Sequence, residues 1–590
     1  MPPSASQALR EVPWLAGVPD DRIEAMAAAA RTHLLAAGAV LYQQGDPATD
    51  LAVVVSGRLR ATSTRSGSPV VDREIGRGEP VGEIGFLTGE PRSATVSAVR
   101  ASVVLRLDRA AVDEALRAAP EVSRTLMALV ADRLRHPVLA SATPSSIGLL
   151  PWRRGGPDVA DGAEEVVGGL ERGGMTALVP GRGGVTDPET AEGLRELIDR
   201  AEAAGDLVVV PLDDRRPGWD DLAARQVDRL LVWAGTGGAP PPGPETSSLL
   251  GDLESDGVTP RRELVLIHAA SGPDPRGVPA WMDATAVARV HHLRSGNAGD
   301  VDRLARHLTG RSLGLVLSGG GARAMAHLGA YRAIAEAGVP IDHVGGSSIG
   351  GVVAAQIASG ASPEELIELD RREFRSAAFG RRFTLPLISL HSIRRAVSLF
   401  EHLFGDRDLS DAWIPSFVTV VDFTDCALVI RDRGPAALWA RATASPPGLW
   451  PPVVDDRGHL FVDGGVVDNL PVTAMRAEGA GLTIAVNVTG RRDLRVAGAD
   501  REITTWPQFA YRTITGRGAP SYPSIVPTIM RLGLLASLGA QVDAIEQTDL
   551  YVDPPVADIG MTNYRRFDDA VDAGYRSTVD ALESGTISLP

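Results

Sequence analysis

The sequence predicts a multidomain α/β protein whose 590 residues form three successive regions. Short β-branched runs separated by glycine turns, typical of a small antiparallel barrel, occupy the first region. Apolar strands that alternate with helical stretches follow, a pattern typical of a parallel sheet covered by helices. The third region begins with a strand, a glycine loop, a helix, a second strand and a serine-containing turn. A chain of this length is expected to hold about three or four domains.

The composition excludes several classes of function and site. Lysine is absent, so a Walker A loop of the form G-x-x-x-x-G-K cannot occur in this chain. The net charge of −15 argues against general nucleic-acid binding. Cys426 is the only cysteine, which rules out an internal disulfide and cysteine-ligated metals and indicates a reducing cytoplasm. No apolar window is long and uncharged enough to span a bilayer, so we expect no transmembrane helix and no signal peptide.

The first region is predicted to be a barrel with a helix on either side in the chain. Its clearest strands are the apolar runs Val40–Tyr42, Leu51–Val55 and Val103–Leu107. Helical patterns precede and follow them, at Asp20–His33 and Asp108–Leu134.

Within this region the run GEIGFLTGEPRSATV, which starts at Gly82, is typical of a phosphate site. Glu83 precedes Arg92 by nine residues, with a short turn of helix expected between them. An arginine binds a phosphate through two parallel hydrogen bonds, while the N–H groups that begin a helical turn stabilise its charge. A glutamate nearby can accept a hydrogen bond from a ribose hydroxyl.

Residues 12–136, including the run QGDPATDLAVVVSGRLR, resemble the cyclic-nucleotide-binding domains. The resemblance implies that Glu83 binds the ribose 2′-hydroxyl and that Gly82 forms the tight turn. It implies that Arg92 and Ser93 bind the cyclic phosphate of cAMP or cGMP, which would be a regulatory ligand. Nothing in the sequence chooses between the two bases. The alternative is a domain that keeps the fold as a docking module and binds no nucleotide.

The second region, residues 145–311, is predicted to be a parallel sheet covered by helices such as Thr190–Ala204. The glycine loop Pro180–Thr186 lacks the lysine of a phosphate loop, and Gly235–Glu245 is expected to be a flexible loop. We therefore expect a structural or coupling role for this domain. Its predicted strands are Ile147–Leu150, Ala177–Val179, Leu207–Val210, Leu230–Trp233 and Leu264–Ile267.

The third region opens with LVLSGGGARAMAHLGAYRAIAEAGVPIDHVGGSSIGG, which starts at Leu315. A strand leads through the glycines Gly319–Gly321 into a helix near Ala324, so consecutive N–H groups can point at a negative oxygen. A second strand, Ile341–Val344, leads into a G-x-S-x-G turn that exposes a serine hydroxyl. Ser348 has glycine on both sides at two residues' distance and is the predicted nucleophile.

Two alternatives bear on this motif. Gly319, Gly321 and Ala324 also fit a dinucleotide fingerprint, for which Asp342 would be the ribose-binding acid. However, Asp342 begins its strand, and the serine turn occupies the place where that acid belongs. The glycine loop and the serine turn are better explained together, as oxyanion donors and nucleophile.

The serine needs a base, and Asp463 is the predicted one. It ends an apolar strand in HLFVDGGVVDNLP and is followed by two glycines. No histidine follows it, as the usual order of serine, acid and histidine would require. His391, His402 and His459 lie between Ser348 and Asp463, so a triad that uses an earlier acid stays open.

The ordered motifs SGGGAR, GSSIG and DGG resemble those of the patatin-like phospholipases, over residues 312–585 and including ARATASPPGLWPP. That family is a lipid acyl hydrolase with a Ser–Asp dyad and no catalytic histidine. The resemblance implies an α/β hydrolase fold in which Ser348 is the nucleophile and Asp463 the base. It makes Gly319, Gly320 and Gly321 the oxyanion loop, supported by Arg323. The sequence departs from the family at Ala324, where glycine is usual, and this puts the shape of the loop in doubt.

The order of the three domains resembles the neuropathy target esterase branch of that family. We therefore expect a cytoplasmic serine esterase that hydrolyses lysophospholipids or phospholipids without metal or catalytic cofactor. The rivals are a cyclic-nucleotide sensor or membrane-associated scaffold with an inactive esterase domain, and a dinucleotide-dependent enzyme. Acyl chain length, head group, oligomeric state and the sign of any regulation stay open.

An arginine-rich segment, residues 371–395, is a candidate for contact with the inner face of the membrane. It holds seven arginines and one acid, Glu373, in a chain otherwise rich in carboxylates. Such a segment suits an interfacial lid, although a solvated helix face explains it equally well. Its arginines are at 371, 372, 375, 381, 382, 394 and 395, and its apolar residues are Phe374, Phe379, Phe383, Leu385, Leu387 and Leu390.

Overall fold

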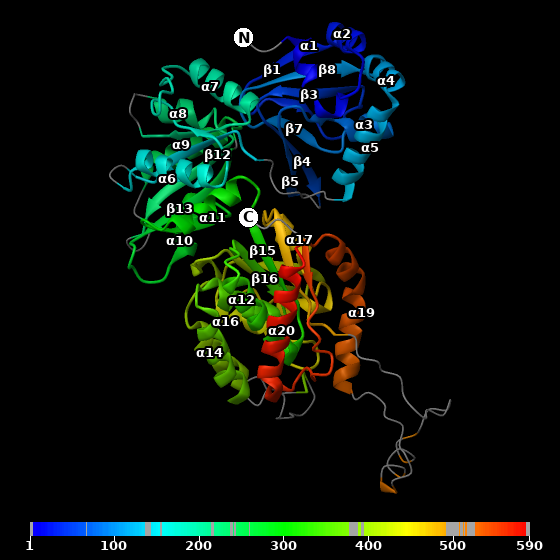
Figure 1. Cartoon of the computed structure of the whole chain (residues 1–590), viewed down its shortest axis with the longest axis vertical. Coiled ribbons are helices and arrows are strands. Elements are labelled where there is room, and N and C mark those ends of the chain that lie inside the picture. Colours follow the sequence, from blue (N-terminus) through cyan, green and yellow to red (C-terminus); the bar gives the residue numbers. More distant parts are fainter. Residues whose placement is uncertain are drawn as a thin grey trace. The chain divides into compact units, whose positions relative to one another are not determined.

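The computed structural model divides the chain into two compact units (Figure 1). Unit 1 comprises residues 1–312 and 476–481, and unit 2 comprises residues 313–475 and 482–590. The structure describes residues 4–65, 68–135, 143–153, 156–213, 218–236, 240, 243–258, 260–376, 388–390, 394–490, 505, 507, 511, 514–515 and 525–585.

The first part of unit 1 consists of two antiparallel four-stranded sheets, ordered β1-β8-β3-β6 and β2-β7-β4-β5. Side chains of both sheets, among them Val54, Leu59 and Val96, form one core. A second core packs β3 and β8 against the helices. The elements are β1 (Arg31–Leu35), β2 (Val40–Tyr42), β3 (Asp50–Ser56), β4 (Leu59–Arg65), β5 (Ser68–Ile75), β6 (Pro80–Val81), β7 (Thr95–Ala98), β8 (Ser102–Asp108), α1 (Ala5–Arg10), α2 (Asp20–Ala29), α3 (Glu83–Thr88), α4 (Arg109–Ala118) and α5 (Pro120–Arg135).

The structure corrects three details of this part. The described strands form two sheets rather than one closed barrel. The first predicted helix ends at Ala29, and His33 lies in β1, where it pairs with Val104 of β8. The second predicted helix is two helices, because Pro120 begins α5 and the residue before a proline is disfavoured in the helical region. Ala119 accordingly has φ −136° and ψ 83°.

The second part of unit 1 is a six-stranded sheet ordered β10-β11-β9-β12-β13-β14, with every neighbouring pair parallel, as predicted. Helices α6 and α11 cover one face, and α7, α8 and α9 cover the other. The elements are β9 (Ser146–Pro151), β10 (Ala177–Leu178), β11 (Leu207–Pro211), β12 (Arg229–Gly235), β13 (Arg261–His268), β14 (Val290–Arg294), α6 (Val159–Arg172), α7 (Ala191–Ala204), α8 (Trp219–Ala224), α9 (Pro244–Ser255), α10 (Val278–Thr285) and α11 (Ala298–Leu308).

Unit 2 is a mixed sheet ordered β19-β20-β17-β16-β15-β21-β22, with β18 paired to β17. Strands β15, β16, β17, β21 and β22 are parallel, so their carboxyl ends share one edge. Figure 1 shows α12 beside α20, which pack together.

The predicted helix near Ala324 begins as the 3-10 turn η2 (Gly321–Met325) and continues as α12. The elements of unit 2 are β15 (Leu313–Leu317), β16 (His343–Ser347), β17 (Ser416–Asp422), β18 (Ala427–Arg431), β19 (Val453–Val454), β20 (Leu460–Asp463), β21 (Leu482–Val486), β22 (Leu550–Val552), α12 (Ala326–Glu336), α13 (Ile349–Ala358), α14 (Pro363–Ser376), α15 (Arg394–Phe404), α16 (Ala436–Thr443), η4 (Gly464–Val466), α17 (Val472–Ala477), α19 (Ile525–Glu546) and α20 (Phe567–Glu583).

Among the helices that the structure describes, none combines the length and apolar character needed to cross a bilayer.

A buried ionic cluster joins the two parts of unit 1. Arg100, in the turn before β8, donates from Nε to Asp228 Oδ1 at 2.6 Å and from Nη2 to Glu202 Oε2 at 3.2 Å. Arg58 Nε lies 3.2 Å from the other carboxylate oxygen of Asp228. Burial raises the pKa of Asp228, but Arg100 and Arg58 outweigh it and hold this pKa at about 2. The carboxylate therefore stays charged and ties two turns of the first part to the start of β12.

We expect Asp228→Ala to lower the free energy of unfolding by about 3–5 kcal/mol, because it leaves two buried guanidinium groups without their shared counter-charge. The matched control is Asp221→Ala, since Asp221 pairs with Arg225 at the surface and such pairs contribute about 0–1 kcal/mol. Chemical denaturation followed by tryptophan fluorescence measures both. A loss below about 1 kcal/mol for Asp228→Ala would show that the cluster is not a structural joint.

Candidate active site and nucleotide pocket

The turn after β16 holds Ser348 in a strained backbone conformation. Its φ of 55° and ψ of −136° are rare for an L-residue and cost about 1–3 kcal/mol. A Cβ on Gly346 would lie 2.5 Å from the carbonyl oxygen of Leu317, and one on Gly350 would lie 2.4 Å from that of Ser318. The two glycines thus let the turn press against the end of β15, which places the serine at the carboxyl edge of the sheet.

The structure brings Ser348 and Asp463 together. Ser348 Oγ donates a hydrogen bond of 2.6 Å to Asp463 Oδ2, and the N–H of Gly465 donates to Asp463 Oδ1 at 2.8 Å. Ser348 is 8% exposed and Asp463 is 4% exposed. Burial raises the pKa of Asp463 to about 7, although the hydrogen bonds from Ser348 and Gly465 act to lower it. The carboxylate is therefore a far stronger base than a solvated one, whose pKa is about 4.

Of the three histidines considered as alternative bases, the two that the structure describes contact groups other than Ser348. His459 Nδ1 lies 2.8 Å from Asp422 Oδ2, and this hydrogen bond raises the pKa of His459. His402 Nε2 lies 3.7 Å from Glu373. His391 lies outside the described residues. Within the described part of the chain, Ser348 Oγ has Asp463 as its hydrogen-bond partner, and no histidine contacts it.

The glycine loop lies directly against the serine. A Cβ on Gly319 would lie 2.7 Å from Ser348 Cβ. Asn469 holds this glycine on both sides, since its carbonyl accepts from the Gly319 N–H at 3.3 Å and its Nδ2 donates to the Gly319 carbonyl at 3.2 Å. In the described residues the N–H groups of Gly320 and Gly321 meet no acceptor. These two N–H groups are therefore available to a developing oxyanion.

Arg323 ties the glycine loop to two later segments of unit 2. Its Nε donates to the carbonyl of Ile559 at 2.7 Å, its Nη2 to that of Ala557 at 3.1 Å and its Nη1 to that of Gly490 at 3.2 Å. Ala324, the departure from the family pattern, is fully buried. The guanidinium group thus fixes the backbone around the loop.

Sequence reasoning missed the groups that orient the two proposed catalytic residues. Thr443 Oγ1 accepts from the Ser348 N–H at 2.9 Å, and the Ser445 carbonyl accepts from the Asp463 N–H at 2.9 Å. Both belong to the run ARATASPPGLWPP, but no local spacing marks them, because their partners are distant in sequence. Asn469 gave no signal for the same reason.

His327, which the sequence analysis also did not identify, supports the strand end that leads into the glycine loop. His327 is fully buried in α12, and its Nε2 lies 2.8 Å from the Ser318 carbonyl. Burial lowers the pKa of His327 to about 4, so the ring is neutral and donates its Nε2–H to this carbonyl.

Asp342 does not fit a dinucleotide site. It is 1% exposed, and its Oδ2 accepts from the N–H of Leu313 at 2.9 Å, at the start of β15. It therefore joins two strands at the edge opposite Ser348, and the ribose-binding interpretation loses its acid.

The described part of the arginine-rich segment is mostly packed or paired. Phe374 is fully buried in the core, Leu390 packs against it, and Arg371 pairs with Glu368 and Asp568. Phe374 is therefore a core residue and not part of a lid. Residues 377–387, which hold Phe379, Arg381, Arg382, Phe383, Leu385 and Leu387, lie outside the described residues.

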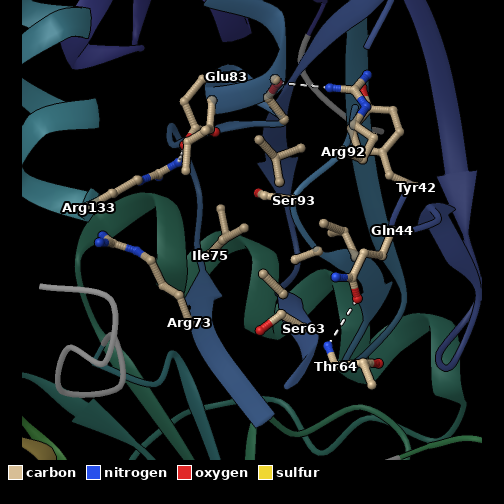
Figure 2. Close-up of a pocket in the computed structure, with 17 residues that line it drawn as sticks. Tyr42, Gln44, Ser63, Thr64, Arg73, Ile75, Glu83, Arg92, Ser93 and Arg133 are labelled. Carbon is tan, nitrogen blue, oxygen red and sulfur yellow. Dashed lines mark hydrogen bonds and ion pairs between the residues drawn. The ribbon is translucent and has the colours of Figure 1, made fainter. Parts of the chain in front are cut away.

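The nucleotide-binding residues predicted in unit 1 line one pocket of about 350 Å³, at the low end of the range typical of ligand sites (Figure 2). Gly82 has φ 80°, which L side chains rarely adopt, and a Cβ there would lie 2.2 Å from Arg92 Nη1, so any other residue would be strained and would displace Arg92. Figure 2 shows Ser93 between Glu83 on one side and Arg92 on the other.

Arg92 is held by partners at the wall of this pocket. Its Nη1 donates to the Gly82 carbonyl at 2.8 Å, and its Nη2 donates to the carboxylate of Asp50 at 2.9 Å. The guanidinium carbon lies 3.6 Å from the centre of the Tyr42 ring, and Figure 2 shows this stacking. A phosphate bound here would therefore accept hydrogen bonds from a guanidinium group that also donates to Asp50.

Glu83 links the pocket to the helix that follows the sheets. Arg133 of α5 lies 2.6 Å from the Glu83 carboxylate, and both are buried. Figure 2 shows the two side chains meeting at the pocket wall. The helix after the sheets is thus attached to the proposed ribose-binding residue.

One buried His and carboxylate group has the atoms of a metal site but the wrong charge. Glu263, His291 and His307 bring ligand atoms within 4.8 Å of one another. Arg261 Nε lies 3.1 Å from Glu263, and Arg229 Nη1 lies 3.5 Å from it. Two guanidinium groups beside the carboxylate oppose a cation, so this group is better explained as an ion-pair network.

Comparison with known proteins identifies two domain families in this chain. A model of the patatin-like phospholipase family matches residues 315–476, and one of the cyclic nucleotide-binding domain matches residues 32–119. An uncharacterized NTE family protein of Mycobacterium tuberculosis H37Rv is 30% identical over 98% of this chain and 97% of its own length.

Two animal relatives are longer. Patatin-like phospholipase domain-containing protein 7 of Mus musculus and protein 6 of Homo sapiens are each 27% identical over 92% of this chain. The matches span 44% and 43% of those proteins. Among solved structures, the N-terminal domain of a transcriptional regulator from Streptomyces coelicolor A3(2) is 31% identical over 22% of this chain and 92% of that chain, with a TM-score of 0.19.

With two matched domains and a relative that is similar over nearly its whole length, the chain belongs to the NTE family and is a patatin-like phospholipase with an N-terminal cyclic nucleotide-binding domain.

Proposed function

We propose that the enzyme hydrolyses acyl esters of lysophospholipids or phospholipids, with Ser348 as nucleophile and Asp463 as base. The observation that carries this proposal is the 2.6 Å hydrogen bond between Ser348 Oγ and a buried carboxylate whose pKa is about 7. A base of near-neutral pKa combines the ionised form with useful proton affinity at physiological pH.

In the first half of the reaction Asp463 takes the proton of Ser348 as Oγ attacks the acyl carbonyl carbon. The carbonyl oxygen becomes an oxyanion, which the N–H groups of Gly320 and Gly321 stabilise. Collapse of this intermediate breaks the ester bond. The leaving alkoxide takes the proton from Asp463, and the acyl group stays on the serine.

In the second half, Asp463 takes a proton from a water molecule that attacks the acyl-enzyme. The same two N–H groups stabilise the second oxyanion. When it collapses, the fatty acid departs and the proton returns to Ser348 Oγ. The ester and one water molecule are the only reactants that these steps consume, and the proton taken by Asp463 in each half is returned.

We expect Ser348→Ala and Asp463→Asn each to lower the hydrolysis of a lysophospholipid by at least about 10³-fold, since the two residues act as a unit. His459→Ala is the matched control and should keep most activity, because His459 is bonded to Asp422 and not to Ser348. Fatty-acid release measures all three. An inactive His459→Ala together with an active Asp463→Asn would replace the dyad by a triad.

We also expect kcat/KM for an uncharged ester to fall about tenfold for each pH unit below about 7. The folded pKa of Asp463 is raised by burial, so lowering the pH through about 7 protonates the base. The profile should be level above that pH and unchanged in His459→Ala. A rate that stays constant down to pH 5 would contradict the assignment of Asp463 as the base.

We propose that unit 1 binds cAMP or cGMP and that binding changes the esterase rate. The convergence of Gly82, Glu83, Arg92 and Ser93 on one pocket supports binding. The bond between Glu83 and Arg133 supports coupling, since a ribose hydroxyl at Glu83 competes with an arginine of α5. A ligand changes activity only if it binds two conformations unequally, and this competition supplies a difference.

Calorimetry on the full chain should give heat with at least one of the two nucleotides. Arg92→Ala should abolish the signal, and Glu83→Gln should weaken binding by about 10–100-fold, the value of a hydrogen bond to a charged group. Arg31→Ala, which changes an exposed residue outside the pocket, is the control. If neither nucleotide gives heat at millimolar concentration, the domain is a docking module.

We further propose peripheral membrane contact through residues 371–395, supported by seven arginines against one acid in a chain of net charge −15. Changing Arg381 and Arg382 to serine should reduce co-sedimentation with anionic vesicles by about 10-fold or more, since each basic residue contributes about 1 kcal/mol. Changing Arg172 and Arg182, which pair with acids, is the control. Vesicle binding that changes neither with salt nor with the replacement of Arg381 and Arg382 would exclude this contact.

A further inference from the structure

Helix α19 in unit 2 shows the reverse of the usual pattern of a surface helix. Among those of its side chains whose burial the structure describes, the buried ones are small or polar, namely Ser537, Gln541 and Ala544. Large apolar residues lie elsewhere on it, and Leu535 and Val542 are 54% and 52% exposed. A helix that packs only for stability buries its apolar stripe. An exposed apolar stripe is typical of a surface that contacts a partner protein, a membrane or a ligand.

Four apolar residues in the carboxyl-terminal half of α19 form one stripe. Leu535, Leu538, Val542 and Ile545 follow one another at steps of three, four and three residues, which places them on one side of a helix. The stripe is about 15 Å long at a rise of about 1.5 Å for each residue. Figure 1 shows α19, in orange, along the outside of unit 2.

Three of these residues, Leu535, Leu538 and Ile545, line a hollow of about 580 Å³ between α19 and the carboxyl ends of β21 and β22. A volume of this size is typical of ligand pockets. Arg531 and Asp553 also line the hollow and carry opposite charges, so it has no net charge from these two side chains.

The polar side chains on the strand side of the hollow bond to one another. Thr489 Oγ1 donates to Asn487 Oδ1 at 2.6 Å, and Asn487 Nδ2 donates to the hydroxyl of Tyr551 at 2.9 Å. Gln541 Nε2 of α19 donates to Thr489 Oγ1 at 3.0 Å. These groups need no ligand to satisfy them. The hollow is thus suited to an apolar occupant that meets the leucine and isoleucine side chains.

The same wall belongs to the proposed active site. Asn469 Nδ2 donates both to Thr489 Oγ1 at 2.9 Å and to the carbonyl of Gly319 at 3.2 Å. The carbonyl of Gly490 accepts from Arg323. Helix α19 also packs against η4, the turn that follows Asp463. A hydrocarbon chain in the hollow would therefore lie beside the glycine loop, which contacts Ser348.

We propose that this hollow is the acyl-chain subsite, in which the hydrocarbon tail of the lipid ester lies along the stripe of α19. This proposal rests on the proposed function, because only the proposed ester hydrolysis identifies the occupant as an acyl chain. It predicts a preference for long acyl chains that is set by α19, because each buried methylene adds to binding.

The test compares 4-nitrophenyl butyrate with 4-nitrophenyl palmitate. Leu538→Trp fills the hollow and should lower kcat/KM for palmitate by about tenfold or more while butyrate stays within about twofold. Ala540→Trp, which adds the same ring at an exposed position outside the hollow, is the control and should leave the ratio unchanged. Leu538→Ser, which adds no bulk, should lower the palmitate rate in the same direction if the tryptophan variant fails to fold.

A binding measurement separates the subsite from the chemistry. Dansyl-undecanoic acid should bind to Ser348→Ala protein and lose affinity when Leu538→Trp is added. If Leu538→Trp weakens dansyl binding but the protein with Ser348 intact cleaves neither ester, the subsite is supported and the proposed hydrolysis is contradicted. Cleavage of both esters at an unchanged ratio, with unchanged dansyl binding, would overturn the subsite alone. If Leu535→Ser dissociates a dimer and leaves the ratio of palmitate to butyrate hydrolysis unchanged, the subsite is overturned. The stripe of α19 would then be an interface with a second copy of this protein.

Discussion

The arrangement of unit 2 depends on one buried hydrogen bond, from Ser348 to Asp463. In water a carboxylate is too weak a base for a serine hydroxyl, and burial is what raises the pKa of Asp463 to about 7. Three backbone hydrogen bonds hold the pair in place: the Gly465 N–H donates to Asp463, the Ser445 carbonyl accepts from the Asp463 N–H, and Thr443 Oγ1 accepts from the Ser348 N–H. The edge of the sheet around Ser348 and Asp463 is therefore organised by hydrogen bonds within the chain before a substrate arrives.

Unit 1 uses charge in two different ways. The cluster around Arg100 and Asp228 is fully internal, so it joins the two parts of the unit and is not free to respond to a ligand. The charged groups of the nucleotide pocket also have partners, but those partners surround a hollow, as Arg133 does at Glu83. A ligand that enters this hollow must compete for them. That competition would give a physical basis for a response in α5, and the internal cluster attaches the first part of the unit to the middle sheet.

The features that the sequence predicted are those encoded in short runs. Ser348 and Asp463 stood out because glycines beside each mark a sharp turn, and most strands stood out as apolar runs. β14 was missed because two histidines interrupt it, although its backbone completes the sheet. Asn469 was missed because its partner Gly319 is distant in sequence. The two facing sheets were predicted as a barrel, since strand pairing depends on contacts that no local pattern records. The break at Pro120 was readable and overlooked.

The most direct test of the account is covalent labelling of the full chain with a fluorophosphonate, followed by peptide mapping. The account predicts one phosphonylated residue, Ser348, and a labelling rate that falls strongly in Asp463→Asn because the base is lost. The Asp422→Asn variant, which removes the partner of His459, should label at the normal rate. Absence of an adduct on Ser348 in a folded chain, or labelling that is indifferent to Asp463, would contradict the central claim and leave a sensor or scaffold with an inactive esterase domain.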